Sequence, residues 1–203
     1  PLRPVDVLAD QLPVSDDPLL LFSNPDCRVL LGRRTDPTPY YARHADGDLL
    51  CFVHQGDGRL ETEFGPLAYR TGDWIYLPKG CTWRQLPDSA SSWLMVEATD
   101  EFRMPAPGPL GRHWPFDPAQ TVIPDPAPID DDGRDEYEVR LVHRPVDGAA
   151  TTSLFYKHNP IDVEGWRGDN FAFTFNIDDY NVVTSDSVHL PPTVHLLMQA
   201  TGV

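Results

Sequence analysis

Proline and glycine limit the elements that this chain can form. The sequence contains 22 prolines and 14 glycines in 203 residues. Proline removes a backbone donor and clashes with the preceding helical turn, so few uninterrupted stretches are long enough for a helix of ordinary length. The runs between these breaks are short and rich in Val, Leu, Tyr, Phe and Trp, which is typical of strands. The sequence therefore predicts an all-β protein with many short strands.

The run GDWIYLPKG at residues 72–80 predicts a strand between two sharp bends. Gly72 tolerates the positive φ of a tight turn, and the apolar residues after it favour a strand. Pro78 cannot donate to a strand ladder, and Gly80 permits a second bend. The spacing of these three residues resembles the second signature of the cupin family, whose members are small antiparallel barrels. We therefore expect a cupin-like, jelly-roll barrel, followed by a second antiparallel β segment.

The N-terminal barrel is expected to occupy residues 1–99, with residues 1–26 as an arm laid across it. Within the barrel, Asp57 and Gly58 form a dipeptide that favours tight primed turns. We therefore expect a hairpin there, with residues 59–64 as its return strand.

The second half of the chain divides into a connection and a further β segment. Residues 100–135 have little periodicity and many prolines, so we expect an irregular connection with its acidic residues 130–132 in solvent. Strands return in residues 136–203, and a second sheet packed beside the barrel accommodates them best. These strands are expected at residues 137–143, 151–157, 171–176, 180–184 and 194–200.

Charge and cysteine content argue against several classes of protein. The net charge of −15 repels nucleic-acid phosphates and anionic lipid surfaces, so we expect neither a nucleic-acid nor a membrane partner. No run approaches the roughly 18 to 20 apolar residues that span a bilayer. Cys27, Cys51 and Cys81 have no paired spacing, which favours neither a disulfide framework nor a cysteine zinc site. These features indicate a reduced, cytoplasmic protein.

The first barrel lacks the side chains with which cupins commonly hold a metal, namely a His-x-His pair, a Glu and a later His. His44 is present, but Asp46 takes the place of its partner, Asp48 that of the Glu and Trp83 that of the later His. One imidazole with one or two carboxylates does not complete a typical Fe or Zn shell. We therefore expect no metal site in this barrel, with the first three residues in turns and Trp83 plugging the core.

Three blocks of sequence resemble the homogentisate 1,2-dioxygenase family. The first is DGDLLCFVHQGDGRLETEFGPLAYRTGDWIYLPKG at residues 46–80, with the family's Asp-Gly-Asp and Thr-Glu-Phe-Gly elements. The second is DVEGWRGDNFAFTFNIDDYNV at residues 162–182, and the third is SVHLPPTV at residues 187–194. All three occur in the family's order, so the chain is similar to the N-terminal and central part of such an enzyme.

This resemblance implies an oxidoreductase, an Fe(II)-dependent, extradiol-type dioxygenase that opens the ring of homogentisate or a related hydroquinone. The reaction belongs to tyrosine and phenylalanine breakdown, and its partners are a small aromatic substrate and O2. The family's two-histidine, one-carboxylate iron site lies downstream of the third block, in a catalytic barrel. The resemblance therefore places the Fe2+ ligands beyond Val203, with no metal or cofactor ligand among these residues. It also implies trimer-based homo-oligomers.

One candidate catalytic residue follows from the resemblance, His189. It matches the family histidine that acts as a base on a substrate ring hydroxyl, and imidazole titrates near neutral pH, as this role requires. The chain differs from the family at Val188 and Pro191, where aspartates are usual. His195 matches a large apolar residue of the family, so we interpret it as a packing residue.

Two other functions remain open. The first is a metal-free, cupin-like binding or assembly module that is complete as given. The second is a cupin isomerase for sugars or nucleotide sugars, which would need a histidine acid and base pair inside the first barrel; Trp83 and Asp46 argue against it. We favour the dioxygenase because the apolar run at residues 196–200 is an unusual place for a natural chain to stop.

Overall fold

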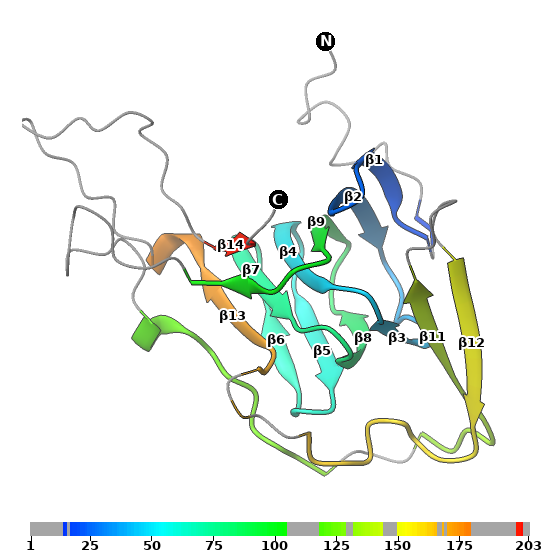
Figure 1. The fold of residues 1–203 in the computed structure, drawn as a ribbon. Helices are drawn as coiled ribbons and strands as arrows, with labels where there is room; N and C mark the ends of the chain where they lie inside the picture. Colours follow the sequence, from blue (N-terminus) through cyan, green and yellow to red (C-terminus); the bar gives the residue numbers. More distant parts are fainter. Residues whose placement is uncertain are drawn as a thin grey trace, which may run out of the picture.

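The computed structural model describes residues 14–15, 17–104, 118–128, 132–143, 150–165, 168, 170–179 and 198–200. Two six-stranded sheets form the body of this part of the chain (Figure 1). The described residues contain no α-helix, only the short 3-10 turns η1 (Pro118–Gln120) and η2 (Ile177–Asp179). The all-β prediction is therefore confirmed.

The first sheet has its strands in the order β1, β2, β9, β4, β7, β13. All five of its strand pairs are antiparallel. Residues 19–23, expected within the arm, form its edge strand, which is exposed along its whole length. The bounds are β1 (Leu19–Ser23), β2 (Cys27–Arg34), β9 (Ser91–Ala98), β4 (Asp48–Gln55), β7 (Asp73–Leu77) and β13 (Phe173–Asn176).

The second sheet has the order β12, β11, β3, β8, β5, β6. Its strands pair antiparallel except β11 and β3, which are parallel. The remaining two strands, β10 (Phe102–Arg103) and β14 (Gln199–Ala200), form a separate antiparallel pair. The bounds are β12 (Ala150–Tyr156), β11 (Tyr137–His143), β3 (Tyr41–His44), β8 (Thr82–Pro87), β5 (Gly58–Thr62) and β6 (Leu67–Tyr69).

The predicted corner at residues 72–80 is a strand between two bends, as expected. Gly72 has φ 90 and Gly80 has φ 82, so both occupy the region that glycine alone adopts without strain. The Gly80 N–H donates to the carbonyl of His44 at 2.8 Å, and the Cys81 N–H donates to that of Pro78 at 3.0 Å. The corner carries the chain from β7 in the first sheet to β8 in the second, which makes a barrel-like body.

The prediction of a hairpin at Asp57 and Gly58 is wrong. β4 pairs with β7 and β9, whereas β5 pairs with β6 and β8, so this turn crosses from one sheet to the other. Gly56 has φ 94, and a Cβ there would lie 2.5 Å from the carbonyl oxygen of Ala90. Turn residues predict the bend itself, but the choice of partner strands depends on the whole core.

The strands after residue 135 do not form the separate sheet that the sequence suggested. β11 lies beside β3, with β12 outside it, and β13 pairs antiparallel with β7. They satisfy backbone groups that β3 and β7 would otherwise leave open at sheet edges, and they extend both barrel sheets. The boundaries at residues 99 and 135 stay a prediction. Of the expected strands, residues 180–184 and 194–197 lie outside the described residues.

The core lies between the two sheets. Its residues come from strands of both, and the alternating pattern of each strand determines which side chains face inward. The first sheet contributes Leu49, Cys51, Val53, Ile75, Leu77, Trp93 and Met95, and the second contributes Leu60, Leu67, Tyr69 and Trp83. Nowhere in the described part is there a helix long and apolar enough to cross a membrane.

Candidate functional site

A cavity of about 380 Å³ extends into the barrel, and the exposed residues Ser15, Asp17 and Pro18 are part of its lining. It lies where alternate residues of β2 and β9 face alternate residues of β3 and β8, since successive side chains of a strand point to opposite faces. Thus β9 contributes four lining residues at every second position, Ser91, Trp93, Met95 and Glu97. Besides these, the polar and aromatic lining residues include Arg28, Tyr40, His44, Trp83 and Gln85.

A carboxylate is buried in this cavity wall. Glu97 is 1% exposed, and its carboxylate lies 3.5 Å from Nη1 of Arg28 and 3.8 Å from Nδ1 of His44. Burial of an unpaired carboxylate would be costly, and the Arg28 guanidinium offsets part of this cost. His44 was expected in a turn; instead it is the last residue of β3 and lines the cavity. Register places it there, because β3 runs along β8 and β11.

Two tryptophans form the aromatic wall of the cavity. Trp83 and Trp93 are 8% and 3% exposed, and their ring centroids lie 6.5 Å apart with planes inclined by 20°. The His44 ring continues this arrangement, 6.4 Å from Trp83 at 13°. Within the described residues, neither buried indole N–H has a hydrogen-bond partner. Trp83 therefore belongs to the core, as predicted, and it also lines the cavity.

Asp48 was also expected in a turn, but it is the first residue of β4 and is 2% exposed. Its carboxylate accepts hydrogen bonds from the Tyr76 hydroxyl at 2.8 Å, the Lys79 N–H at 2.7 Å and the Phe102 N–H at 2.9 Å. Burial, together with this carboxylate, raises the pKa of Tyr76 well above its ordinary value, so the phenol stays a donor. Asp48 thereby links β4 to β7, to the corner and to β10. Asp46 is half-buried in the turn before β4, as expected.

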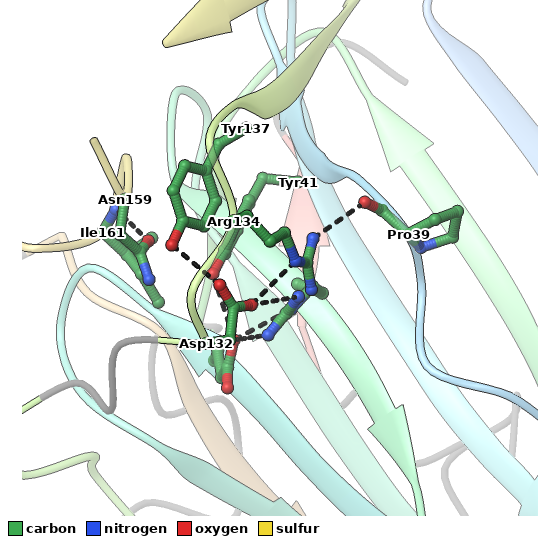
Figure 2. A network of polar contacts seen from close by, with 9 residues as sticks. Pro39, Tyr41, Asp132, Arg134, Tyr137, Asn159 and Ile161 are labelled. Carbon is green, nitrogen blue, oxygen red and sulfur yellow. Dashed lines mark hydrogen bonds and ion pairs between the residues drawn. The ribbon is translucent and has the colours of Figure 1, made fainter. Parts of the chain in front are cut away.

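A second polar network joins the connection to the second sheet (Figure 2). Asp132 accepts a hydrogen bond from the Tyr137 hydroxyl at 2.7 Å and pairs with Nε of Arg134 at 2.8 Å. Desolvation alone would raise its pKa, but the hydroxyl and the guanidinium outweigh burial and lower it. Asp132 was expected in solvent; it is exposed, and it is also paired with the Tyr137 hydroxyl and the Arg134 guanidinium. Residues 130 and 131 lie outside the described residues.

Arg84, in β8, also belongs to this network, because its guanidinium lies 3.7 Å from the Asp132 carboxylate. Its guanidinium pairs with Glu61 at 2.7 Å through Nη2 and lies 4.9 Å from the centroid of the Tyr41 ring. Desolvation is the largest cause that raises the pKa of Tyr41 to about 12. Every member of this cluster has a protein partner, so we interpret it as a structural tie between strands rather than a reaction site.

Comparison with known proteins places this barrel in a family. Residues 36–177 match the family model described as homogentisate 1,2-dioxygenase N-terminal. The chain belongs to this family. The homogentisate 1,2-dioxygenases of Pseudomonas syringae pv. tomato and Pseudomonas savastanoi pv. phaseolicola are each 30% identical over 161 residues, which is 78% of this chain and 36% of each relative. The chain therefore spans about a third of the length of these curated relatives.

Two solved structures with low similarity to this chain are titled as cupins. An RmlC-like cupin protein from Desulfovibrio desulfuricans has a TM-score of 0.40 at 13% identity, covering 45% of this chain and 92% of that one. A cupin-2 domain protein from Shewanella frigidimarina has a TM-score of 0.37 at 17% identity, covering 40% and 79%.

The iron that the homogentisate 1,2-dioxygenase family implies does not fit the described residues of this member. Among them, no three His, Cys, Asp or Glu side chains gather closely enough to hold a metal ion. In the barrel, His44 lies 3.8 Å from Glu97, but the third group there is the cationic Arg28. A guanidinium repels a cation and has no lone pair to offer.

The residue that the family resemblance suggested, His189, lies outside the described residues, as does His195. The sequence analysis missed Arg28, Trp93 and Glu97. A signal for Glu97 was present, because a single acidic residue interrupts the apolar run of residues 93–98. A charge at a core position of a strand indicates either a buried pair or a ligand site.

Proposed function

We propose that this chain forms the N-terminal barrel of an Fe(II)-dependent, ring-cleaving dioxygenase that acts on homogentisate or a related hydroquinone with O2. The observation that carries the proposal is the family match over residues 36–177, together with curated relatives named homogentisate 1,2-dioxygenase. The iron ligands lie outside these 203 residues, and iron supplies the site where substrate and O2 react. The enzyme is a cytoplasmic, trimer-based homo-oligomer of tyrosine and phenylalanine breakdown.

In the sequence, the segment that contains His189 lies between two elements that the structure describes. That segment is bracketed by two elements held on the barrel, β13 by its ladder with β7 and β14 by its ladder with β10. β10 is in turn tied to the core, because its Phe102 N–H donates to Asp48. Positioning of a catalytic group by rigid elements is a requirement for efficient proton transfer.

We assign His189 the role of general base toward a ring hydroxyl of the substrate. Support comes from the sequence SVHLPPTV at residues 187–194. An imidazole that is neutral near pH 7 accepts the phenolic proton and so increases electron density in the ring before O2 attacks. In the iron-loaded enzyme, His189→Ala is expected to lower kcat by about 100-fold or more. His195→Ala is the matched control with little expected effect, and wild-type turnover in His189→Ala would refute the assignment.

Oxygen uptake tests the proposed function directly. The longer polypeptide that contains this chain, loaded with Fe(II), is expected to consume one O2 per homogentisate. 4-Hydroxyphenylacetate, which lacks the second ring hydroxyl, is expected to be inert. The 203-residue chain with Fe(II) is expected to show no uptake. Absence of uptake by the longer polypeptide, or turnover by the short chain alone, would overturn the proposal.

A further inference from the structure

The edges of the two barrel sheets differ in how they are protected against pairing with a further strand. An edge strand presents unpaired N–H and C=O groups, and proteins blunt such edges with short strands, bulges, prolines or charges. The sheets end in four edge strands, β1 and β13 in the first sheet and β12 and β6 in the second. Among the described residues, three of these strands have such a feature and β12 has none.

The protected edges are β6, β13 and β1. β6 has only three residues, and β13 has four. The free side of β13 is also covered, because Val122 and Thr174 exchange two backbone hydrogen bonds, of 2.8 and 2.9 Å. In β1, the register with β2 shifts between Leu20 and Phe22, as in a bulge. A bulge twists an edge away from a flat partner, so β1 is a poor template for pairing although its side chains are apolar and exposed.

β12 is long, regular and uncharged. Its sequence ATTSLFY contains no proline and no charged residue, and its seven residues pair with β11 without a register shift. It is the outermost strand of the second sheet (Figure 1). Five of its residues are exposed, and Phe155 is 61% exposed. Within the described part of the chain, no backbone hydrogen bond joins β12 to any segment other than β11. Such an edge is a template for another strand.

The order of residues in β12 suits antiparallel pairing with a second copy of itself. Around a twofold axis through Ser153, Thr151 of one copy lies opposite Phe155 of the other. A β-branched residue opposite an aromatic one is a pair that stabilises antiparallel sheets. The twofold axis forms this pair twice, once on each side of Ser153.

The charges around β12 also permit a second copy to approach. The chain has a net charge of −15, so two copies repel each other over most of their surfaces. β12 itself is uncharged, and on the adjacent β11 the guanidinium of Arg140 lies 2.8 Å from Glu138. Just after β12, Lys157 lies 3.0 Å from Glu136. A second copy therefore meets neutral residues and paired charges at this edge.

We propose that the free edge of β12 binds β12 of a second copy of this chain, in an antiparallel pair centred on Ser153. The pair joins the second sheets of the two copies into one continuous sheet of twelve strands. A single strand pair is small beside the roughly 1,200–2,000 Å² of a stable interface, so the contact is weak and reversible. It concerns association rather than ring cleavage, so its test does not depend on the proposed dioxygenase function.

Sedimentation of the 203-residue chain over roughly 10 µM to 1 mM tests the contact. The wild type is expected to pass from monomer to dimer across this range. Ser153→Lys places like charges opposite each other at the axis and is expected to raise the dissociation constant at least about tenfold. Ser89→Lys is the matched control, because Ser89 is exposed in the turn between β8 and β9. Monomers throughout, trimers in place of dimers, or equal effects of the two variants would overturn the proposal.

A cysteine at position 153 tests the register and the occupant. Opposite residues of an antiparallel pair have Cα atoms about 4.5–5.5 Å apart, a separation that a disulfide can bridge. After oxidation with diamide, Ser153→Cys is therefore expected to form covalent dimers. Ser23→Cys, on the exposed edge strand β1, is expected to stay monomeric, as is the wild type with its half-buried Cys27.

The same cross-link is expected in the longer polypeptide that contains this chain. A cross-link in the 203-residue chain alone would show that the remaining polypeptide covers β12, and would overturn a second copy as the occupant. Failure of Ser153→Cys to cross-link in both proteins would overturn the contact itself.

Discussion

Removal of the Asp48 carboxylate is expected to destabilise the barrel more than the change of any exposed aspartate. The carboxylate is almost completely buried and accepts three hydrogen bonds, from Tyr76, Lys79 and Phe102. Two of these donors are backbone N–H groups, one in the corner after β7 and one in β10. The variant Asp48→Ala leaves all three without an acceptor.

The size of the effect follows from these contacts. An unsatisfied buried donor costs about 1–3 kcal/mol, and two of the three donors are only partly buried, so water can reach them. We therefore expect Asp48→Ala to lower the free energy of unfolding by about 3 kcal/mol. Asp48→Asn keeps one acceptor oxygen and turns an NH2 group toward the remaining donors, so about half of that loss is expected.

Urea unfolding followed by tryptophan fluorescence measures these losses. Asp88→Ala serves as the control, because Asp88 is exposed and its change is expected to stay within about 0.5 kcal/mol. The slope of the free energy against urea concentration should not change, since the same surface unfolds. If Asp48→Ala lost no more stability than Asp88→Ala, the assignment of Asp48 as the link between β4, β7 and β10 would be wrong.

Two further predictions follow from local geometry. A Cβ at Gly47 would collide with a carbonyl oxygen of β9, so Gly47→Ala is expected to lower the free energy of unfolding by about 3 kcal/mol. Gly133→Ala is expected to lower it by only about 1 kcal/mol, because φ there is 69 but no atom lies near the added Cβ. Equal losses for the two variants in urea unfolding would contradict this prediction. Burial raises the pKa of Tyr41 to about 12, whereas an unfolded tyrosine ionises near 10. The folded state keeps a proton that the unfolded state loses, so this stabilisation is complete below pH 10 and is lost as the pH rises through 12. As the pH rises from 10 to 12, the free energy of unfolding of Tyr41→Phe is therefore expected to fall less than that of the wild type. Parallel curves of unfolding free energy against pH for the two proteins would show that the pKa of Tyr41 is not raised in the folded state.

Part of the site could be anticipated from sequence and part could not. Trp83, at a strand position, predicts a core side chain, and the structure places it in the core. The cavity could not be foreseen, because its wall combines Arg28, His44 and Glu97 from strands that are far apart in the chain. Their meeting depends on the register of three strand pairs, and a shift of one residue would turn each side chain to the other face.

The sequence by itself determined that this chain is all-β, where its strands begin and end around Gly72, Pro78 and Gly80, and to which family it is similar. These properties are local, because proline, glycine and period-two alternation act over a few residues. Only the tertiary structure decided that β4 and β5 lie in opposite sheets and that β11 and β13 complete the barrel. It also decided that Asp48 is a buried link rather than a turn residue. Strand partners and buried charges depend on long-range contacts, which are chosen by the free energy of the whole core.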